Sequence, residues 1–140
     1  MPLTIARTDD IDACRRLRRI VFIHEQGVSE ADEIDDLDDQ AIHLLATDDG
    51  MPVGSARLLT IGVTGKIGRV CVLKSLRGKG IGTELIKAAV DVFRSMPGIT
   101  RVKLGSQTHA VGFYERLGFS VIGPQYEDAG ILHREMVITL

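Results

Sequence analysis

The spacing of hydrophobic residues in the first part of the chain predicts a strand followed by a helix. A short apolar segment over residues 3–6 is typical of a strand. Asp9 and Asp10 then offer oxygens that can cap a helix, and apolar residues recur at helical spacing from Ile11 to about Glu25. Arginines 15, 16, 18 and 19 predict a basic outer face for this helix. The seven acidic residues between positions 30 and 39 predict a solvated loop or a weak helical turn.

The next segment alternates short apolar runs with turn signals. Runs over 41–47 and 51–60 flank Asp48-Asp49-Gly50 and predict a β-hairpin. A turn over 62–66 and a valine-rich run over 67–73 extend it to an antiparallel meander. Apolar residues at helical spacing from Ile81 to Met96 then predict an amphipathic helix, which is followed by a strand over 102–105. This strand-helix-strand unit predicts that the second half of the sheet is parallel.

The last third predicts a short helix over 108–117 and two strands, over 119–122 and 131–140. The chain therefore has a mixed α/β fold with the order β-α-β-β-β-α-β-α-β-β. Its 140 residues fit within one domain spanning 1–140, because domains usually contain from ~50 to ~250 residues.

Composition narrows the classes of partner. With 17 basic and 19 acidic residues the net charge is -2, so the positive charge that binds nucleic acid nonspecifically is missing. No apolar run approaches the ~18 to 20 residues of a membrane span, and the first residues lack a signal-peptide pattern. We expect a cytoplasmic protein with no nucleic-acid and no membrane partner. Cys14 and Cys71 lie in apolar segments without metal-ligand spacing, which predicts buried thiols and no metal site.

A glycine-rich turn before Ile81 is the most informative segment. Gly78, Gly80 and Gly82 remove side chains that would keep backbone N–H groups from an anion at the helix N-terminus. Arg77 and Lys79 add positive charge, so the turn predicts a phosphate site. The dinucleotide motif places its third glycine one residue later, and the nucleoside-triphosphate loop needs Ser or Thr after its lysine. The other interpretation is a capping turn that binds no ligand.

The turn belongs to a longer set of motifs. Arg77-Gly78-Lys79-Gly80-Ile81-Gly82, preceded by Val70-Cys71-Val72 and followed by Phe113-Tyr114-Glu115-Arg116-Leu117-Gly118-Phe119, resembles the GNAT superfamily of acyl-CoA-dependent N-acetyltransferases. The order of elements is also similar to the GNAT fold over nearly the whole chain. Segments 21–28, 30–39, 69–73, 106–110 and 128–133 resemble the ElaA-like branch. Many GNAT members have Asn seven residues before the tyrosine, where this chain has Gln107.

The resemblance implies acetyl-CoA as cosubstrate. In the family the R/Q-x-x-G-x-G/A turn holds the coenzyme A pyrophosphate, and backbone groups of the preceding strand pair with the pantetheine arm. The N–H of Val72 would polarise the thioester carbonyl. The implied coenzyme site consists of Val70, Cys71, Val72, Arg77, Gly78, Lys79, Gly80, Ile81, Gly82, Thr83 and Gln107.

The resemblance also implies direct attack of an amine on the thioester in a ternary complex. Tyr114 occupies the family's usual general-acid position, and the alternative for this residue is a packed aromatic ring. A covalent route through Cys71 is disfavoured, because no His is adjacent and an apolar strand keeps a thiol protonated.

The general base is less clearly marked, because the strand over 101–105 contains no acid. Glu25 is the first candidate, since a carboxylate there could hold the substrate ammonium and accept its proton through water. His133 is the second, with an unperturbed pKa near ~6.5. A structural hydrogen bond is the alternative for each. Phe22, Gln26 and Asp128 are candidate substrate-binding residues.

These residues predict an N-acetyltransferase that modifies a primary amine of a small molecule or a protein. One alternative is a GNAT-like domain that senses acyl-CoA without turnover. Another is an enzyme similar to acyl-homoserine-lactone synthases, although those are usually longer. The sequence allows a homodimer and leaves the amine open.

Overall fold

The turns in the first half of the sheet determine how its strands pair. In the computed structural model, which describes residues 3–140, β1 (Leu3–Thr8), β2 (Ile42–Asp48), β3 (Met51–Ile61) and β4 (Thr64–Val72) pair in sequence order and antiparallel. Asp49 and Gly50 both have positive φ, as the tight turn between β2 and β3 requires. The predicted hairpin and meander are confirmed, although β4 begins at Thr64 rather than at residue 67.

The second half of the sheet corrects the expectation of parallel strands. β5 (Arg101–Gln107) is parallel to β4, but it pairs antiparallel with β7 (Ile131–Thr139), which in turn pairs antiparallel with β6 (Ser120–Asp128). The strand order is β1-β2-β3-β4-β5-β7-β6. The crossover helix imposes parallel pairing only on the two strands that it connects. β6 and β7 are joined by a tight turn and therefore pair antiparallel.

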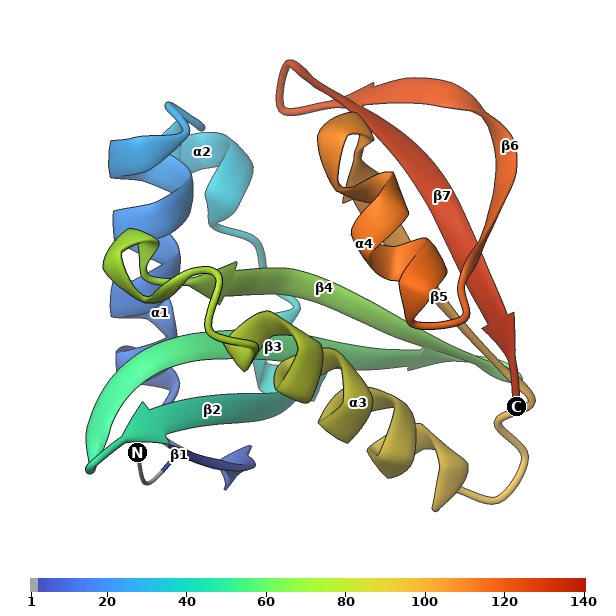
Figure 1. Cartoon of the computed structure of the whole chain (residues 1–140), viewed down its shortest axis with the longest axis horizontal. Helices are drawn as coiled ribbons and strands as arrows, with labels where there is room; N and C mark the ends of the chain where they lie inside the picture. Colours follow the sequence, from blue (N-terminus) through green and yellow to red (C-terminus); the bar gives the residue numbers. More distant parts are fainter. Residues whose placement is uncertain (1–2) are drawn as a thin grey trace.

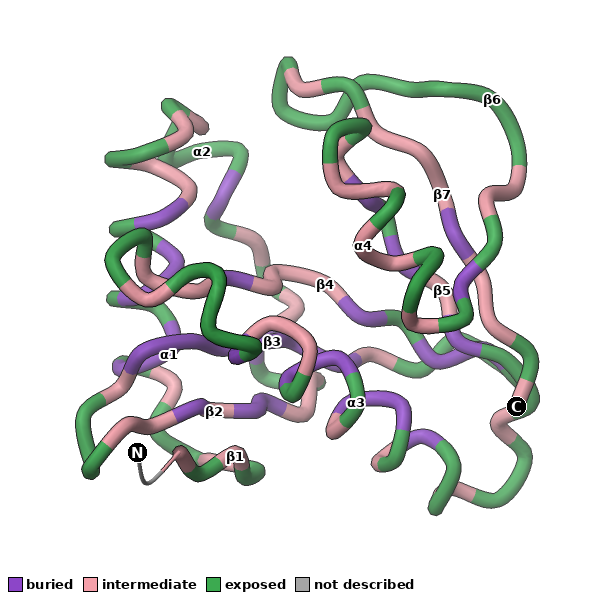
Figure 2. The backbone as a smooth tube through the Cα atoms, in the orientation of Figure 1, coloured by how far each residue is buried: buried purple, intermediate pink, exposed green. Residues whose placement is uncertain are grey.

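Helices cover both faces of the sheet (Figure 1). α3 (Ile81–Arg94) packs on β2, β3 and β4, and its Leu85, Ala89 and Phe93 are fully buried against the main core. α1 (Ile11–Arg18) contacts the same three strands, and its Leu17 belongs to a second, smaller cluster that includes Cys71. α4 (Val111–Arg116) packs beside β5 and β6. Buried residues concentrate in the central strands and in the inner faces of α1 and α3 (Figure 2).

The first helix changes its geometry before it ends. The α-helical turns of α1 give way at Arg19 to a π-helical segment, η1 (Arg19–Glu25), with an i to i−5 hydrogen bond of 3.1 Å from the N–H of Gln26 to the carbonyl of Val21. Helical structure thus runs to Glu25 as predicted. π-Helical turns are often found at functional sites. Here the segment contains or adjoins Phe22, Glu25 and Gln26.

The acidic stretch forms short helical turns, which is one of the two predictions for it, but it is only partly solvated. It forms α2 (Glu30–Glu33) and a short 3-10 turn (Asp38–Gln40), and Glu33 and Asp38 are buried. The predicted basic outer face of the first helix is confirmed at three exposed positions, which are Arg15, Arg16 and Arg19. Arg18 is the exception, because it is buried and meets these acids. Local charge density suggested solvent exposure, but ion pairing across distant segments compensates the burial of both signs.

Candidate active site

β4 and β5 separate after four paired positions. Their register runs from Thr64 opposite Arg101 to Ile67 opposite Leu104, and beyond it β4 continues to pair only with β3. A bulge places two residues of β4, Arg69 and Val70, opposite one residue of β3, and Arg69 has a φ of 51°. Backbone groups of β4 on the side of β5 are therefore left without a strand partner. This is the position predicted for the pantetheine arm.

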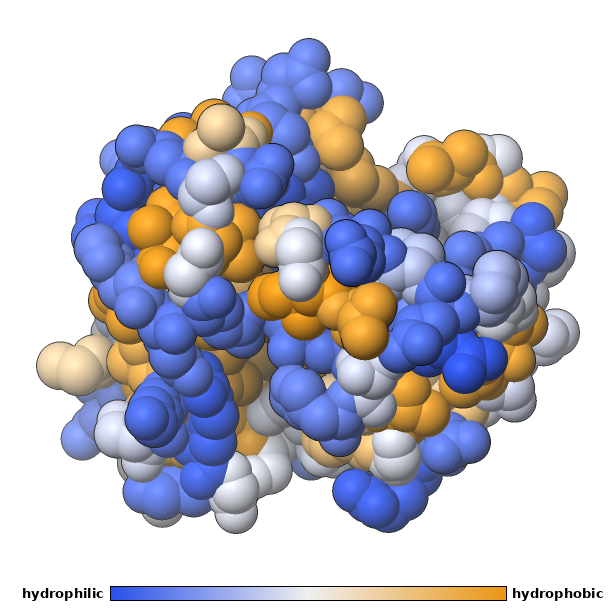
Figure 3. Space-filling model, turned by 90° about the horizontal axis from the view of Figure 1, so that it is seen from above, coloured by the Kyte–Doolittle hydropathy of each residue, from blue (hydrophilic) through white to orange (hydrophobic). Residues whose placement is uncertain are grey.

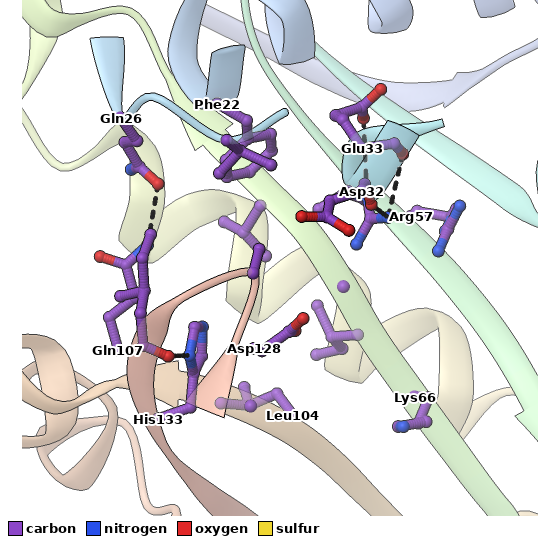
Figure 4. A pocket seen from close by; sticks show the side chains of 18 of the residues that line it. Phe22, Gln26, Asp32, Glu33, Arg57, Lys66, Leu104, Gln107, Asp128 and His133 are labelled. Atoms are coloured by element: carbon purple, nitrogen blue, oxygen red, sulfur yellow. Dashed lines mark hydrogen bonds and ion pairs between the residues drawn. The ribbon is translucent and has the colours of Figure 1, made fainter. Parts of the chain in front are cut away.

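A cavity of about 410 Å³ opens where the two strands part. Its floor includes β4 residues 67–70 and, on β5, Leu104, Gly105 and Gln107. η1 and α2 form one wall, and α4 with the β6–β7 hairpin forms the other (Figure 4). When the molecule is viewed from above, groups of hydrophobic side chains are exposed between areas of hydrophilic side chains (Figure 3). A small-molecule substrate fits a cavity of this size.

The glycine-rich turn leads into the N-terminus of α3. Gly78 and Gly80 have φ values of 80° and 84°, which favour glycine, and Gly80 is the N-cap residue. No side chain caps the helix, and a Cβ built at Gly80 meets no described atom within 4 Å. The first-turn N–H groups of α3 thus have no side-chain cap among residues 3–140, and the exposed Lys79 immediately precedes Gly80. A pyrophosphate fits this arrangement of amides, helix dipole and lysine.

Arg77 and Glu25 form a bidentate ion pair between the turn and the end of η1. Both terminal nitrogens of Arg77 donate to the Glu25 carboxylate, one of them over 2.6 Å, and its Nε donates to the carbonyl of Val72 over 3.1 Å. The guanidinium of Arg77 thus binds Glu25. The sequence had suggested instead that Arg77 binds a phosphate group. Hydrogen bonding to Arg77 lowers the pKa of Glu25, which makes this carboxylate a weaker base. Glu25 also lies outside the residues that line the cavity.

Tyr114, the candidate general acid, lies on α4. It lines the cavity, and its ring packs edge-on against Phe113 and Phe119 with centroid distances of 5.0 and 6.1 Å. Burial raises the pKa of Tyr114 to about 12, so the phenol keeps its proton at neutral pH. The ring of Tyr114 is therefore packed against its neighbours, and its hydroxyl group is protonated. A packing role and a general-acid role are compatible in this position.

His133 lies on β7 and lines the same cavity. Its Nδ1 is 2.7 Å from the carbonyl oxygen of Ile131, which can only accept, so Nδ1 carries a proton. In the neutral ring Nε2 is then the atom with a free lone pair. The ring stacks on Tyr126 with a centroid distance of 5.7 Å. A Cβ at Gly105 would collide with the Tyr126 hydroxyl oxygen, so a larger residue there would have to displace the exposed Tyr126 side chain.

Two glutamines connect the η1 wall of the cavity to its floor on β5 (Figure 4). The side-chain amide of Gln107 donates to Gln26 over 2.9 Å, and its oxygen is 2.9 Å from Nε2 of the exposed His109. Phe22 and Asp128 line the cavity from η1 and from β6. The three candidate substrate-binding residues thus meet in one cavity, and Gln107 joins them instead of facing the glycine-rich turn.

An ion-pair network that the sequence did not suggest supports the β3–β4 side of the cavity. Arg18 and Arg57 bind Asp38 over 2.9 and 3.2 Å, and Arg69 bonds to Asp35 over 3.3 Å. Burial alone would raise the pKa of Asp38, yet hydrogen bonds from Arg18 and Arg15 hold it well below its ordinary value. The paired residues are 15 to 36 positions apart, so no local motif indicates them.

The two cysteines are free and buried, as predicted. Burial raises the pKa of Cys71, whose sulfur lies 3.4 Å from the hydroxyl of Ser55, so the thiol is poorly suited to act as a nucleophile. Within residues 3–140 there is no group of three or more His, Cys, Asp and Glu side chains that could hold a metal ion. None of the helices in that range is long and apolar enough to cross a membrane.

The sequence and the fold of this chain are both similar to those of GNAT acetyltransferases and their relatives. The family profile described as acetyltransferase (GNAT) domain matches residues 20–140. YyaT of Bacillus subtilis is 38% identical over 127 residues, which cover 89% of this chain and 85% of that protein. ElaA of Escherichia coli is 33% identical over 125 residues, 86% of this chain and 82% of ElaA. The ElaA crystal structure has a TM-score of 0.82 at 28% identity and covers 96% of this chain and 97% of that one. An acyl-CoA N-acyltransferase structure from Pseudomonas aeruginosa has a TM-score of 0.84 at 30% identity and covers 96% and 97%.

Proposed function

This chain belongs to the GNAT acetyltransferase family, and from that premise we propose that it transfers the acetyl group of acetyl-CoA to a primary amine. The observation that carries the proposal is the separation of β4 from β5 beside an open glycine-rich turn, with Tyr114 in the same cavity. The Pseudomonas aeruginosa structure of similar fold is described as an acyl-CoA N-acyltransferase, which agrees with this assignment.

The open turn and the free edge of β4 fit a coenzyme A moiety. Amides of residues 78–83 and Lys79 would bind the pyrophosphate, and backbone groups of residues 70–72 would bind the pantetheine arm. Acetyl-CoA supplies an activated acetyl group as a thioester. The turn and the strand edge hold it next to the acceptor cavity, so that attack proceeds in a ternary complex.

One side chain donates a proton in the proposed reaction, and another accepts one. Tyr114 gives its proton to the departing thiolate, which its raised pKa allows because the phenol stays protonated at neutral pH. His133 accepts the proton of the amine at Nε2, since Nδ1 is committed to the Ile131 carbonyl. We assign the base to His133 in preference to Glu25, because the Arg77 pair keeps Glu25 ionised, weakly basic and outside the cavity. In this account Glu25 fixes the position of the turn.

The test is thiol release from acetyl-CoA with a panel of primary amines, together with mass spectrometry of the amine products. We expect at least one amine to release thiol in equal amount to acetylated product. Acetyl-CoA binding with no amine-dependent thiol release would favour the sensor alternative and would contradict the proposal.

A further inference from the structure

Arg57 of β3 is a buried arginine with one donor left over. Its side chain is 6% exposed and lines the acceptor cavity. Its terminal nitrogens bond to Asp35 over 2.7 and 2.9 Å and to Asp38 over 3.2 Å. Its Nε has no hydrogen-bond partner among residues 3–140. A buried N–H group without a partner is costly, and in native proteins it usually meets a ligand, an ion or a water.

Comparison with Arg18 shows that the ion-pair network does not need this donor. Arg18 is equally buried, belongs to the same network and uses all its nitrogens, with Nε bonded to Glu33 over 2.8 Å. Arg18 does not line the acceptor cavity, whereas Arg57 does. Within residues 3–140 the Nε atoms of the network that lack a hydrogen-bond partner belong to Arg57 and Arg69, and both of these arginines line the cavity. Arg57 is the more deeply buried of the two, with a side chain 6% exposed against 24% for Arg69.

The charges around the cavity differ between its two sides. Arg57, Lys66 and Arg69 line the β3–β4 side, and Lys66 is exposed. The ion-pair network on this side contains four arginines and three acids, so its net charge is one positive. Its members are Arg15, Arg18, Arg57, Arg69, Glu33, Asp35 and Asp38. Asp32 of α2 adds one negative charge at the exposed rim. Asp128 lines the other side of the cavity, together with His133 and Tyr126.

We propose that the acceptor is a primary amine that also carries a carboxylate, as amino acids do. The carboxylate accepts a hydrogen bond from Arg57 Nε and is attracted by Lys66. The ammonium end lies toward Asp128 and His133. Asp128 attracts it, and His133 removes its proton. This inference rests on the proposed acetyl transfer, and it makes Arg57 a residue that determines specificity.

In this orientation each bond that forms is matched by a bond that breaks, and each proton has an acceptor. The amine nitrogen forms a bond to the acetyl carbon while the carbon–sulfur bond breaks. His133 first takes one proton of the ammonium at Nε2, so that a neutral amine attacks. The departing thiolate takes the proton of Tyr114, and the second nitrogen proton returns to the Tyr114 phenolate and leaves the amide. His133 releases its proton to solvent. The carboxylate takes no part in bond formation and only holds the amine in place.

Matched substrates and matched variants test the proposal. The probes are the standard L-amino acids, β-alanine and γ-aminobutyrate, each beside its own carboxamide, with thiol release from acetyl-CoA as the readout. Arg57→Lys keeps a positive charge for Asp35 and Asp38 but deletes the Nε donor. Arg134→Lys is the matched control, because Nε of Arg134 also lacks a partner within residues 3–140 but Arg134 lies outside the cavity. Lys66→Gln, at an exposed position, serves if Arg57→Lys does not fold.

We expect the best carboxylate substrate to exceed its carboxamide in kcat/KM by roughly tenfold or more, as a hydrogen bond to a charged group allows. Arg57→Lys should raise KM for that substrate by about tenfold and leave the carboxamide unchanged. Lys66→Gln should act in the same direction by a few-fold, and Arg134→Lys should change neither substrate. A parallel measurement follows the melting temperature with the same carboxylates, which bound ligand raises without turnover.

The outcomes separate this inference from the transferase assignment. If carboxamides react as well as carboxylates, or if Arg57→Lys and Lys66→Gln leave the preference intact, the substrate class is wrong although acetyl transfer stands. If no amine reacts but carboxylates stabilise the wild type and not Arg57→Lys, the carboxylate site stands and the transferase assignment is wrong. If neither turnover nor stabilisation is seen, both are wrong.

Discussion

Replacing Asp38 by Asn tests whether the buried ion-pair network holds the acidic segment 30–40 against the sheet. The Asp38 carboxylate accepts four hydrogen bonds, from Arg15 over 3.0 Å, from Arg18 over 2.9 and 3.1 Å and from Arg57 over 3.2 Å. An amide has one acceptor oxygen, and its NH2 group would face arginine donors. Removing one partner from a buried ion pair costs about 3–5 kcal/mol of the free energy of unfolding. For 140 residues at ~2.1 cal/mol/K per residue, each kcal/mol shifts the melting temperature by about 3 °C, so we expect a drop of roughly 10–17 °C.

Urea unfolding at several pH values is the assay, followed by far-UV circular dichroism because the chain has no tryptophan. The pKa of Asp38 is lowered in the folded state, so its stabilising contribution is complete above the unfolded value near ~3.9 and is lost as the pH falls through the folded value. The difference between wild type and Asp38→Asn should therefore be largest near neutral pH and shrink below about pH 4.

Asp91→Asn is the matched control for this measurement. Asp91 pairs with Arg94 over 3.6 Å, and the two side chains are 74% and 55% exposed. An exposed pair contributes about 0–1 kcal/mol, so the control should change stability little. If Asp38→Asn loses no more than Asp91→Asn, or if its loss does not depend on pH, the network does not stabilise the fold in the way argued here.

Three further substitutions test the site. Tyr114→Phe should lower kcat by roughly 100-fold with acetyl-CoA affinity unchanged, and full activity would leave the ring with a packing role only. Glu25→Gln should weaken acetyl-CoA binding a few-fold by releasing Arg77, while the pH profile of kcat/KM keeps its shape; loss of the acidic limb of that profile would identify Glu25 as the base after all. Gly105→Ala should displace the exposed Tyr126 side chain and change the free energy of unfolding by no more than about 0.5 kcal/mol, which urea unfolding measures; a loss of several kcal/mol would show that the ring cannot move.

Local chemistry accounts for the parts of the fold that the sequence predicted. The turn at Asp49-Gly50 requires positive φ and marks a hairpin wherever it lies between two apolar runs. The alternating glycines before α3 mark an open helix N-terminus in the same way, and Tyr114, which its motif marks as the candidate general acid, lines the cavity. These features depend on residues within one turn of each other, so a single sequence reveals them.

Long-range pairing accounts for what the sequence did not predict. Glu25 and Arg77 are 52 positions apart, and each has a plausible separate role until the fold brings them together. The acidic stretch looked solvated because its partners, Arg57 and Arg69, lie on β3 and β4. Tyr126 entered the site only through its register opposite His133 on β7. The insertion of β7 between β5 and β6 is likewise a property of the whole sheet.

Acetyl-CoA binding at the glycine-rich turn is the central claim, and a titration followed by melting temperature tests it most directly. Gly80→Asp puts a side chain and a negative charge into the open space at the N-terminus of α3. Gly50→Asp is its control, because Gly50 also has positive φ and open space around its Cα but lies in the β2–β3 turn. Wild type and Gly50→Asp should gain melting temperature with the logarithm of acetyl-CoA excess over Kd, and Gly80→Asp should gain none. An equal gain in folded Gly80→Asp would contradict the assignment of this turn to the coenzyme.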